Sequence, residues 1–152
     1  MKKAILMIGN TLRGDDGITT YLGYLLEKEN LGWKVFYGGD TPESEFHALR
    51  AFAPDMIVVA DAMTGIEIGK VELIDISDER DYMYSTHNLP MPILLSYLKG
   101  FCQVVLFLGL NVDIEKVLDI NPAISKEAEA TAHRALSKML EIDAIFDEEK
   151  IS

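Results

Sequence analysis

The run Met56-Ile57-Val58-Val59-Ala60 is the most hydrophobic stretch of the chain, and it ends at Asp61. A short, continuous apolar run that stops at a polar residue is typical of a strand buried on both faces of a sheet. Two similar runs cover residues 4–8 and 104–108, and each of them ends at a glycine. Strands of this kind predict a mainly parallel sheet, because parallel sheets are covered on both faces.

The segments between these runs alternate between helical and extended patterns. Apolar residues three or four positions apart predict helices over residues 18–31, 43–53 and 90–98 and beyond Asn121-Pro122, which we interpret as an N-cap and the first helical residue. Residues 34–37 predict a short strand, and residues 71–76, which mix apolar and charged side chains, predict an antiparallel edge strand. This alternation predicts a three-layer α/β sandwich, with a mostly parallel, twisted sheet of about five strands, one antiparallel edge strand and helices on both faces.

Length, charge and cysteine content narrow the class of protein. The 152 residues suit a single domain over residues 1–146, followed by a flexible acidic tail over residues 147–152. The net charge of −11 repels phosphate backbones and anionic lipid, so we expect neither nucleic acid nor a membrane as partner. The single cysteine, Cys102, excludes an internal disulfide framework. The apolar start of the chain is too short for a signal peptide or a membrane span, and we expect a cytoplasmic monomer.

The loops that follow the strands carry the chemistry of an open α/β sheet. The first of them reads Gly9-Asn10-Thr11-Leu12-Arg13-Gly14-Asp15-Asp16-Gly17. Its glycines are spaced as in a phosphate-binding P-loop, but aspartate stands at both positions where that motif needs lysine and a hydroxyl. Because two carboxylates would repel a polyphosphate, we reject nucleotide binding at this loop. Asp15 and Asp16 either cap the following helix, whose dipole favours negative charge, or belong to a site.

Asp61 and His87 are the other candidates for a site. Asp61 directly follows a buried strand, although a lone aspartate there is more often a turn former. Asp16 and Asp61 share one edge of the sheet if their strands are near neighbours, and a divalent cation would relieve their mutual repulsion. His87 lies in a predicted loop before a helix, whereas His47 and His133 fall within predicted helices. A loop histidine alone is more often a surface residue, but two carboxylates and an imidazole suit nickel or zinc.

Four segments together resemble the hydrogenase maturation proteases, and most closely the branch that acts on the hydrogenase of formate hydrogenlyase. The four segments are Gly9-Asn10 with Gly14-Asp15-Asp16-Gly17, Gly38-Gly39 with Pro42-Glu43, Asp61-Ala62, and Ser85-Thr86-His87-Asn88-Leu89-Pro90. Each segment alone is a weak signal, whereas the set and its order are specific. Phe107-Leu108-Gly109 and the last predicted helix are similar too, so the resemblance covers nearly the whole chain.

The resemblance implies an endopeptidase that removes a short C-terminal extension from the large-subunit precursor of a nickel–iron hydrogenase, after nickel insertion. Asp16, Asp61 and His87 match the family's metal-contacting residues and would form the catalytic site. The resemblance also implies that the nickel belongs to the precursor, so the free enzyme need not carry a metal. Water would attack the scissile peptide, activated either by the metal or by one carboxylate as general base.

One segment departs from the family pattern. The family often has Asp-Gly-Gly followed by a small residue, where this chain has Tyr37-Gly38-Gly39-Asp40. The substitution changes the charge at the mouth of the site and leaves the particular substrate open.

Two alternatives come from other classes of protein. A phosphoacceptor receiver domain also has an acid pair after its first strand and an aspartate after its third. It needs a lysine after a late strand, however, and residues 109–113 contain none. An inactive metal-binding scaffold of the same fold is the second alternative.

Overall fold

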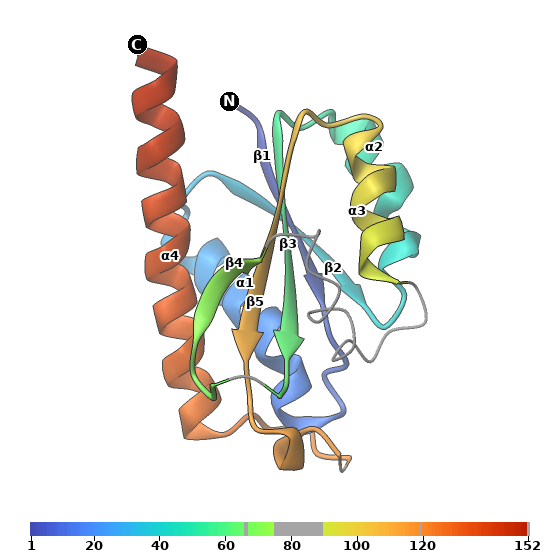
Figure 1. Cartoon of the computed structure of the whole chain (residues 1–152), viewed down its shortest axis with the longest axis vertical. Helices are drawn as coiled ribbons and strands as arrows, with labels where there is room; N and C mark the ends of the chain where they lie inside the picture. Colours follow the sequence, from blue (N-terminus) through green and yellow to red (C-terminus); the bar gives the residue numbers. More distant parts are fainter. Residues whose placement is uncertain (66, 75–89, 119, 152) are drawn as a thin grey trace.

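The computed structural model describes residues 1–65, 67–74, 90–118 and 120–151. Its centre is one five-stranded sheet in the order β2-β1-β3-β5-β4 (Figure 1). The strands are β1 (Lys3–Ile8), β2 (Trp33–Gly39), β3 (Met56–Met63), β4 (Val71–Ile74) and β5 (Val104–Asn111). All neighbours pair in parallel except β4, which runs antiparallel to β5 at one edge. The predicted number of strands, their directions and the antiparallel edge strand are confirmed.

Helices cover both faces of this sheet (Figure 1). The α-helices are α1 (Ile18–Glu29), α2 (Phe46–Phe52), α3 (Met91–Lys99) and α4 (Lys126–Ile151), and short 3-10 helices lie at η1 (Gly14–Gly17), η2 (Pro42–Glu45) and η4 (Ile114–Lys116). Alternate residues of β1 and β3 point to opposite faces, because successive side chains of a strand alternate. Met7 and Val58 pack with α1 and α4, whereas Leu6 and Val59 pack with α2 and α3. The three-layer sandwich is therefore confirmed.

The last helix begins later than the sequence predicts. Asn121 does not cap it, because the main chain of Asn121 bonds to the first loop instead: its N–H donates to the Leu12 carbonyl (2.7 Å), and its carbonyl accepts from Gly14 N–H (2.6 Å). The helix starts at Lys126, and the Ser125 hydroxyl oxygen accepts from Ala128 N–H at 3.1 Å. Ser125 is thus the residue that caps α4.

The last turns of α4 include most of residues 147–152, for which the sequence predicts a flexible tail. The helix continues to Ile151, so the backbone is helical there rather than irregular. The flexibility of residues 147–152, and the division of the chain that follows from it, stay predictions. Among the described helices, none is both long and apolar enough to cross a membrane.

Candidate functional site

Asp61 lies inside the central strand and not after it. The prediction that the strand stops at Ala60 is wrong, because β3 keeps pairing with β5 as far as Met63. On its other side, β1 ends at Ile8, which is the register partner of Asp61. Asp61 is fully buried, at 0% exposure. Its carboxylate therefore stands in the sheet at the point where a neighbouring strand gives way to a loop.

Asp16 is held in the loop that leaves β1 at this point. It belongs to η1, which contacts β3, and its side chain is only 6% exposed. One carboxylate oxygen, Oδ2, accepts from the Asn10 backbone N–H at 2.7 Å. A short bond from N–H to an ionised oxygen is among the stronger hydrogen bonds in proteins. The loop therefore positions the Asp16 carboxylate by its own main chain.

Gly9 allows the start of the loop to lie close to the backbone of Asp16. It has φ +154°, and a methyl group in place of its hydrogen would lie 2.1 Å from the carbonyl oxygen of Asp16. Two non-bonded heavy atoms cannot sit so close, so only glycine fits here without moving η1. Gly9 N–H also donates to the Gly39 carbonyl at 3.0 Å, which joins the ends of β1 and β2.

Asp15 has a different task from its neighbour. It is 2% exposed, and its carboxylate accepts from the N–H of Ser125 at 2.7 Å and from the Ser125 hydroxyl at 2.6 Å. Helix α1, in contrast, has Gly17 at its N-cap and no side-chain cap. The interpretation that the acid pair caps the following helix is therefore wrong. Asp15 fastens the first loop to the start of α4, and Asp16 stays the predicted site acid of this loop.

The structure brings two of the three predicted site residues, Asp16 and Asp61, to the carboxyl ends of the parallel strands. Asp61 is paired with Ile8, and the loop that begins at the next residue folds back so that Asp16 lies against Gly9. His87 lies outside the described residues. Among the residues that are described, no group of three or more His, Cys, Asp and Glu side chains could hold a metal ion. The triad of Asp16, Asp61 and His87 therefore stays a prediction.

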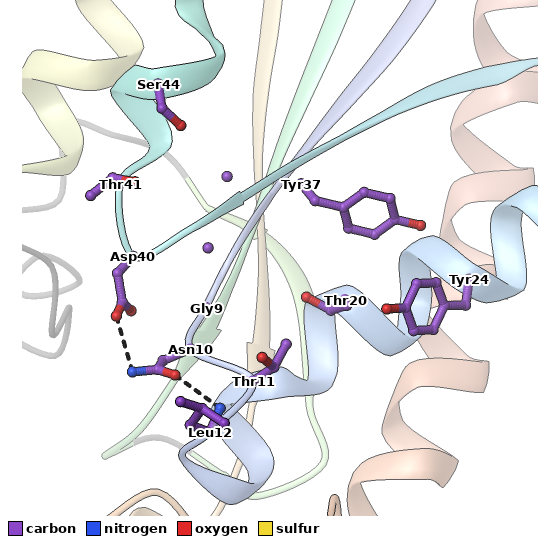
Figure 2. Close-up of a pocket in the computed structure, with 12 residues that line it drawn as sticks. Gly9, Asn10, Thr11, Leu12, Thr20, Tyr24, Tyr37, Asp40, Thr41 and Ser44 are labelled. Carbon is purple, nitrogen blue, oxygen red and sulfur yellow. Dashed lines mark hydrogen bonds between the residues drawn. The ribbon is translucent and has the colours of Figure 1, made fainter. Parts of the chain in front are cut away.

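A pocket of about 530 Å³ opens beside the Asp16 loop (Figure 2). The first loop, α1, the end of β2 and the residues that follow it as far as Ser44 supply its lining, which includes Asn10, Tyr24, Tyr37 and Asp40. Asp40 is its one charged lining residue, and its Oδ2 accepts from Asn10 Nδ2 at 3.0 Å. The carboxamide of Asn10 thus bridges the two loops on which Asp16 and Asp40 stand.

Tyr37 begins the segment that departs from the expected family pattern. Its ring packs on α1, since a methyl group at Gly23 would lie 2.7 Å from it, and it lies 5.6 Å from the Tyr24 ring. Burial, and then the charge of Glu27, raises the pKa of the Tyr37 hydroxyl above its usual value. The phenol therefore stays neutral and supplies no negative charge to this side of the pocket.

The remaining sequence candidates lie away from this edge. Cys102 is buried between α3 and β5, at the end where β5 begins, and burial raises the pKa of its thiol. A buried, protonated thiol is a poor nucleophile. His133 is exposed on α4 with its ring against Tyr21, and His47 is exposed on α2. None of these side chains joins Asp16 and Asp61.

Asn10 is not among the predicted site residues, although it lies in the first loop. Its side-chain Oδ1 accepts from Leu12 N–H at 2.9 Å, two residues along the chain. Asparagine at such a position commonly forms a turn with its own backbone, and that tendency was the available signal. Its contact with Asp40 had no sequence signal, because 30 residues separate the two.

Comparison with known proteins assigns a family to this chain. The family model described as hydrogenase maturation protease matches residues 21–142. The Hydrogenase 3 maturation protease of Escherichia coli K12 is 34% identical over 117 residues, which are 75% of this chain and 75% of that protein. A hydrogenase maturation protease described as putative, from Methanocaldococcus jannaschii, is 31% identical over 153 residues, covering 93% of this chain and 88% of its own.

Solved structures agree with this assignment. An uncharacterized protein from Wolinella succinogenes is 48% identical, with a TM-score of 0.81 over 96% of this chain and 99% of its own. A NiFe hydrogenase maturation protease from Thermococcus kodakarensis is 27% identical, with a TM-score of 0.76 over 93% and 92% of the two chains. Because the family model and the relatives are hydrogenase maturation proteases, the alternative of a receiver domain is excluded. The chain therefore belongs to the hydrogenase maturation protease family, and it is a peptidase.

Proposed function

We propose that this peptidase removes the C-terminal extension of a nickel-loaded large-subunit precursor of a nickel–iron hydrogenase, with that nickel as its recognition signal. Asp16, Asp61 and His87 would contact the metal. Relatives named as hydrogenase maturation proteases support the class of substrate. The observation that carries the proposal is the burial of two carboxylates, Asp16 and Asp61, at one edge of the sheet.

The distribution of buried charge supports a role for this edge in binding a cation. Among the described residues, the buried charged side chains are Asp15, Asp16 and Asp61, and all of them are acids. Burying a carboxylate is unfavourable unless hydrogen bonds or a cation compensate. Asp15 is compensated by Ser125, within the fold itself. Asp16 accepts from Asn10 N–H in the loop that follows β1, and Asp61 is the register partner of the last residue of β1. Both therefore lie near the carboxyl ends of the parallel strands, where ligands bind in sheets of this type.

His87 would supply the third ligand. It comes four residues before α3, which begins at Met91. Helix α3 packs on the face of the sheet toward which Asp61 points, because Val59 and Met63 alternate onto the same face and pack with Met91 and Leu94. A neutral imidazole and two carboxylates suit nickel and leave coordination positions for the precursor's own ligands.

The proposed reaction is hydrolysis of one peptide bond next to the metal. Contact between the precursor's nickel and the three side chains would hold the scissile carbonyl in place, and positioning alone can contribute about 7–11 kcal/mol to lowering a barrier. Water then adds to the carbonyl carbon, and the C–N bond breaks with the proton passing to the leaving amine. The metal would activate this water by lowering its pKa, or one carboxylate would take its proton as general base.

A processing assay with nickel-loaded and nickel-free precursor tests this function. We expect cleavage of the loaded precursor only, and a loss of about 100-fold or more for Asp16→Asn, Asp61→Asn and His87→Gln. Asp55→Asn is a matched control, because this exposed acid bonds to Lys2 N–H at the opposite edge of the sheet.

The three possible failures have different meanings. Equal cleavage of loaded and nickel-free precursor would refute the nickel signal. Normal processing by Asp16→Asn would refute the site, and no cleavage by the native chain would favour the inactive scaffold.

A further inference from the structure

We propose that Asn10 is a positioning residue for Asp16, and that Asp40 anchors Asn10 in the orientation this requires. The inference concerns the geometry of the loop, and its catalytic consequence rests on the function proposed above. Three hydrogen bonds of one residue carry it, and two of them are drawn in Figure 2.

The first bond joins Asn10 to the site. Its backbone N–H donates to Asp16 Oδ2 at 2.7 Å, across six residues of the loop. The direction of this N–H determines where that carboxylate oxygen rests, because hydrogen bonds weaken steeply away from linearity. A rotation of the peptide plane before Asn10 would therefore turn the carboxylate of Asp16.

The other two bonds prevent this rotation by holding the side chain at both ends. Oδ1 accepts from Leu12 N–H at 2.9 Å, and Nδ2 donates to Asp40 Oδ2 at 3.0 Å (Figure 2). The carboxamide has distinct donor and acceptor ends, and here each end has a matching partner. The Asn10 side chain thus connects both to its own turn and to the loop after β2.

The anchor itself stands on a second strand. Asp40 follows β2, and the adjacent Gly39 carbonyl accepts from Gly9 N–H at 3.0 Å. The ends of β1 and β2 are therefore joined twice, once by main chain and once through the Asn10 side chain. Asp40 is exposed and lines the pocket, so a change there alters Asp16 without touching it.

The pair offers a test in which the hydrogen bond is first broken and then reversed. Asn10→Asp keeps an oxygen for Leu12 N–H but sets a second carboxylate against Asp40. Adding Asp40→Asn restores a donor, which now points from position 40 to position 10. For nickel-loaded precursor, we expect the single-turnover rate at saturation to fall about 10- to 100-fold in Asn10→Asp. The double variant recovers most of that rate, and the half-saturating precursor concentration changes less than the rate.

Two further variants separate positioning from folding. Asp40→Ala removes the anchor and should also lower the rate, whereas Asp40→Asn retains an acceptor oxygen and should stay near the native rate. Asn30→Asp is the matched control, because it makes the same chemical change at the C-cap of α1, away from the pocket. A fall in rate that follows thermal unfolding across all variants, with no recovery in the double variant, would overturn the proposal.

A second measurement does not depend on cleavage. The amide proton of Asn10 should resonate downfield in the native protein, since it donates a short bond to a carboxylate. It should move upfield in Asp40→Ala and not in Asp40→Asn. An unchanged shift in Asp40→Ala refutes the anchor even when processing is normal. If the native chain cleaves nothing, the function proposed above fails, while the amide shift still decides the role of Asn10.

Discussion

Replacing Asp15 by alanine tests the division of labour between the two neighbouring acids. The carboxylate of Asp15 is 2% exposed and accepts two hydrogen bonds from Ser125, at 2.7 and 2.6 Å. Each hydrogen bond to a charged acceptor contributes about 1.5–3 kcal/mol. Ser125 is partly exposed, so water replaces part of what is lost. We therefore expect Asp15→Ala to lower the free energy of unfolding by about 2–4 kcal/mol.

Urea unfolding and thermal melting measure this loss. For a domain of this length, 3 kcal/mol corresponds to a fall in Tm of about 6–12 °C. Asp15→Asn keeps one oxygen for Ser125 N–H and should lose less than half as much. A double-mutant cycle of Asp15→Asn with Ser125→Ala should give a coupling energy of about 1 kcal/mol or more, because the two side chains are in direct contact.

Activity provides the contrast with Asp16. At a temperature where Asp15→Ala is folded, its processing rate should stay near the native rate, whereas Asp16→Asn should lose processing even where it is fully folded. A loss below about 0.5 kcal/mol for Asp15→Ala, the size of an ordinary surface substitution, would refute its structural role. Loss of processing in fully folded Asp15→Ala would refute the separation of the two acids.

Other parts of the fold give three further expectations. Gly9→Ala should lower the free energy of unfolding by about 2–4 kcal/mol in urea titrations, because the added methyl group meets the Asp16 carbonyl oxygen and the backbone conformation suits glycine; an unchanged midpoint would contradict this. The thiol of Cys102 should be alkylated far more slowly in the native protein than in urea at the same pH, since burial both shields it and raises its pKa, and Cys102→Ala should still process precursor. Asp143→Ala should lower stability by about 1–2 kcal/mol, because Asp143 joins α4 to the Trp33 indole N–H at 3.1 Å, and an unchanged melting curve would refute that contribution.

Apolar patterning predicted the sheet well, because strands buried on both faces need unbroken runs of apolar residues. Residues 4–8 lie within β1, and residues 71–74 of the expected edge strand form β4. Strand ends were predicted less well. The run of apolar residues stops at Ala60, but hydrogen bonding to β5 carries β3 on to Met63. A ladder of backbone hydrogen bonds continues wherever the neighbouring strand offers partners. The last pair of this ladder is Met63 and Asn111, which are 48 residues apart in the sequence.

The acidic loop separates local from tertiary information most clearly. Its composition excluded a phosphate site, because charge alone decides that question. It could not distinguish Asp15 from Asp16, since both stand in the same short helix with the same chemistry. Their partners distinguish them: Asp15 meets Ser125, 110 residues away, while Asp16 meets the backbone of its own loop.

The sequence by itself determined the class of fold, the acids at the sheet edge and the resemblance to a family of peptidases. These follow from periodicity, charge and motif order, which are properties of short segments. Only the tertiary structure decided that Asp61 stands within a strand, that Asp15 secures α4, and that Asn10 joins Asp16 to Asp40. Each of these depends on hydrogen bonds between segments far apart in the chain, and no local pattern specifies such a partner.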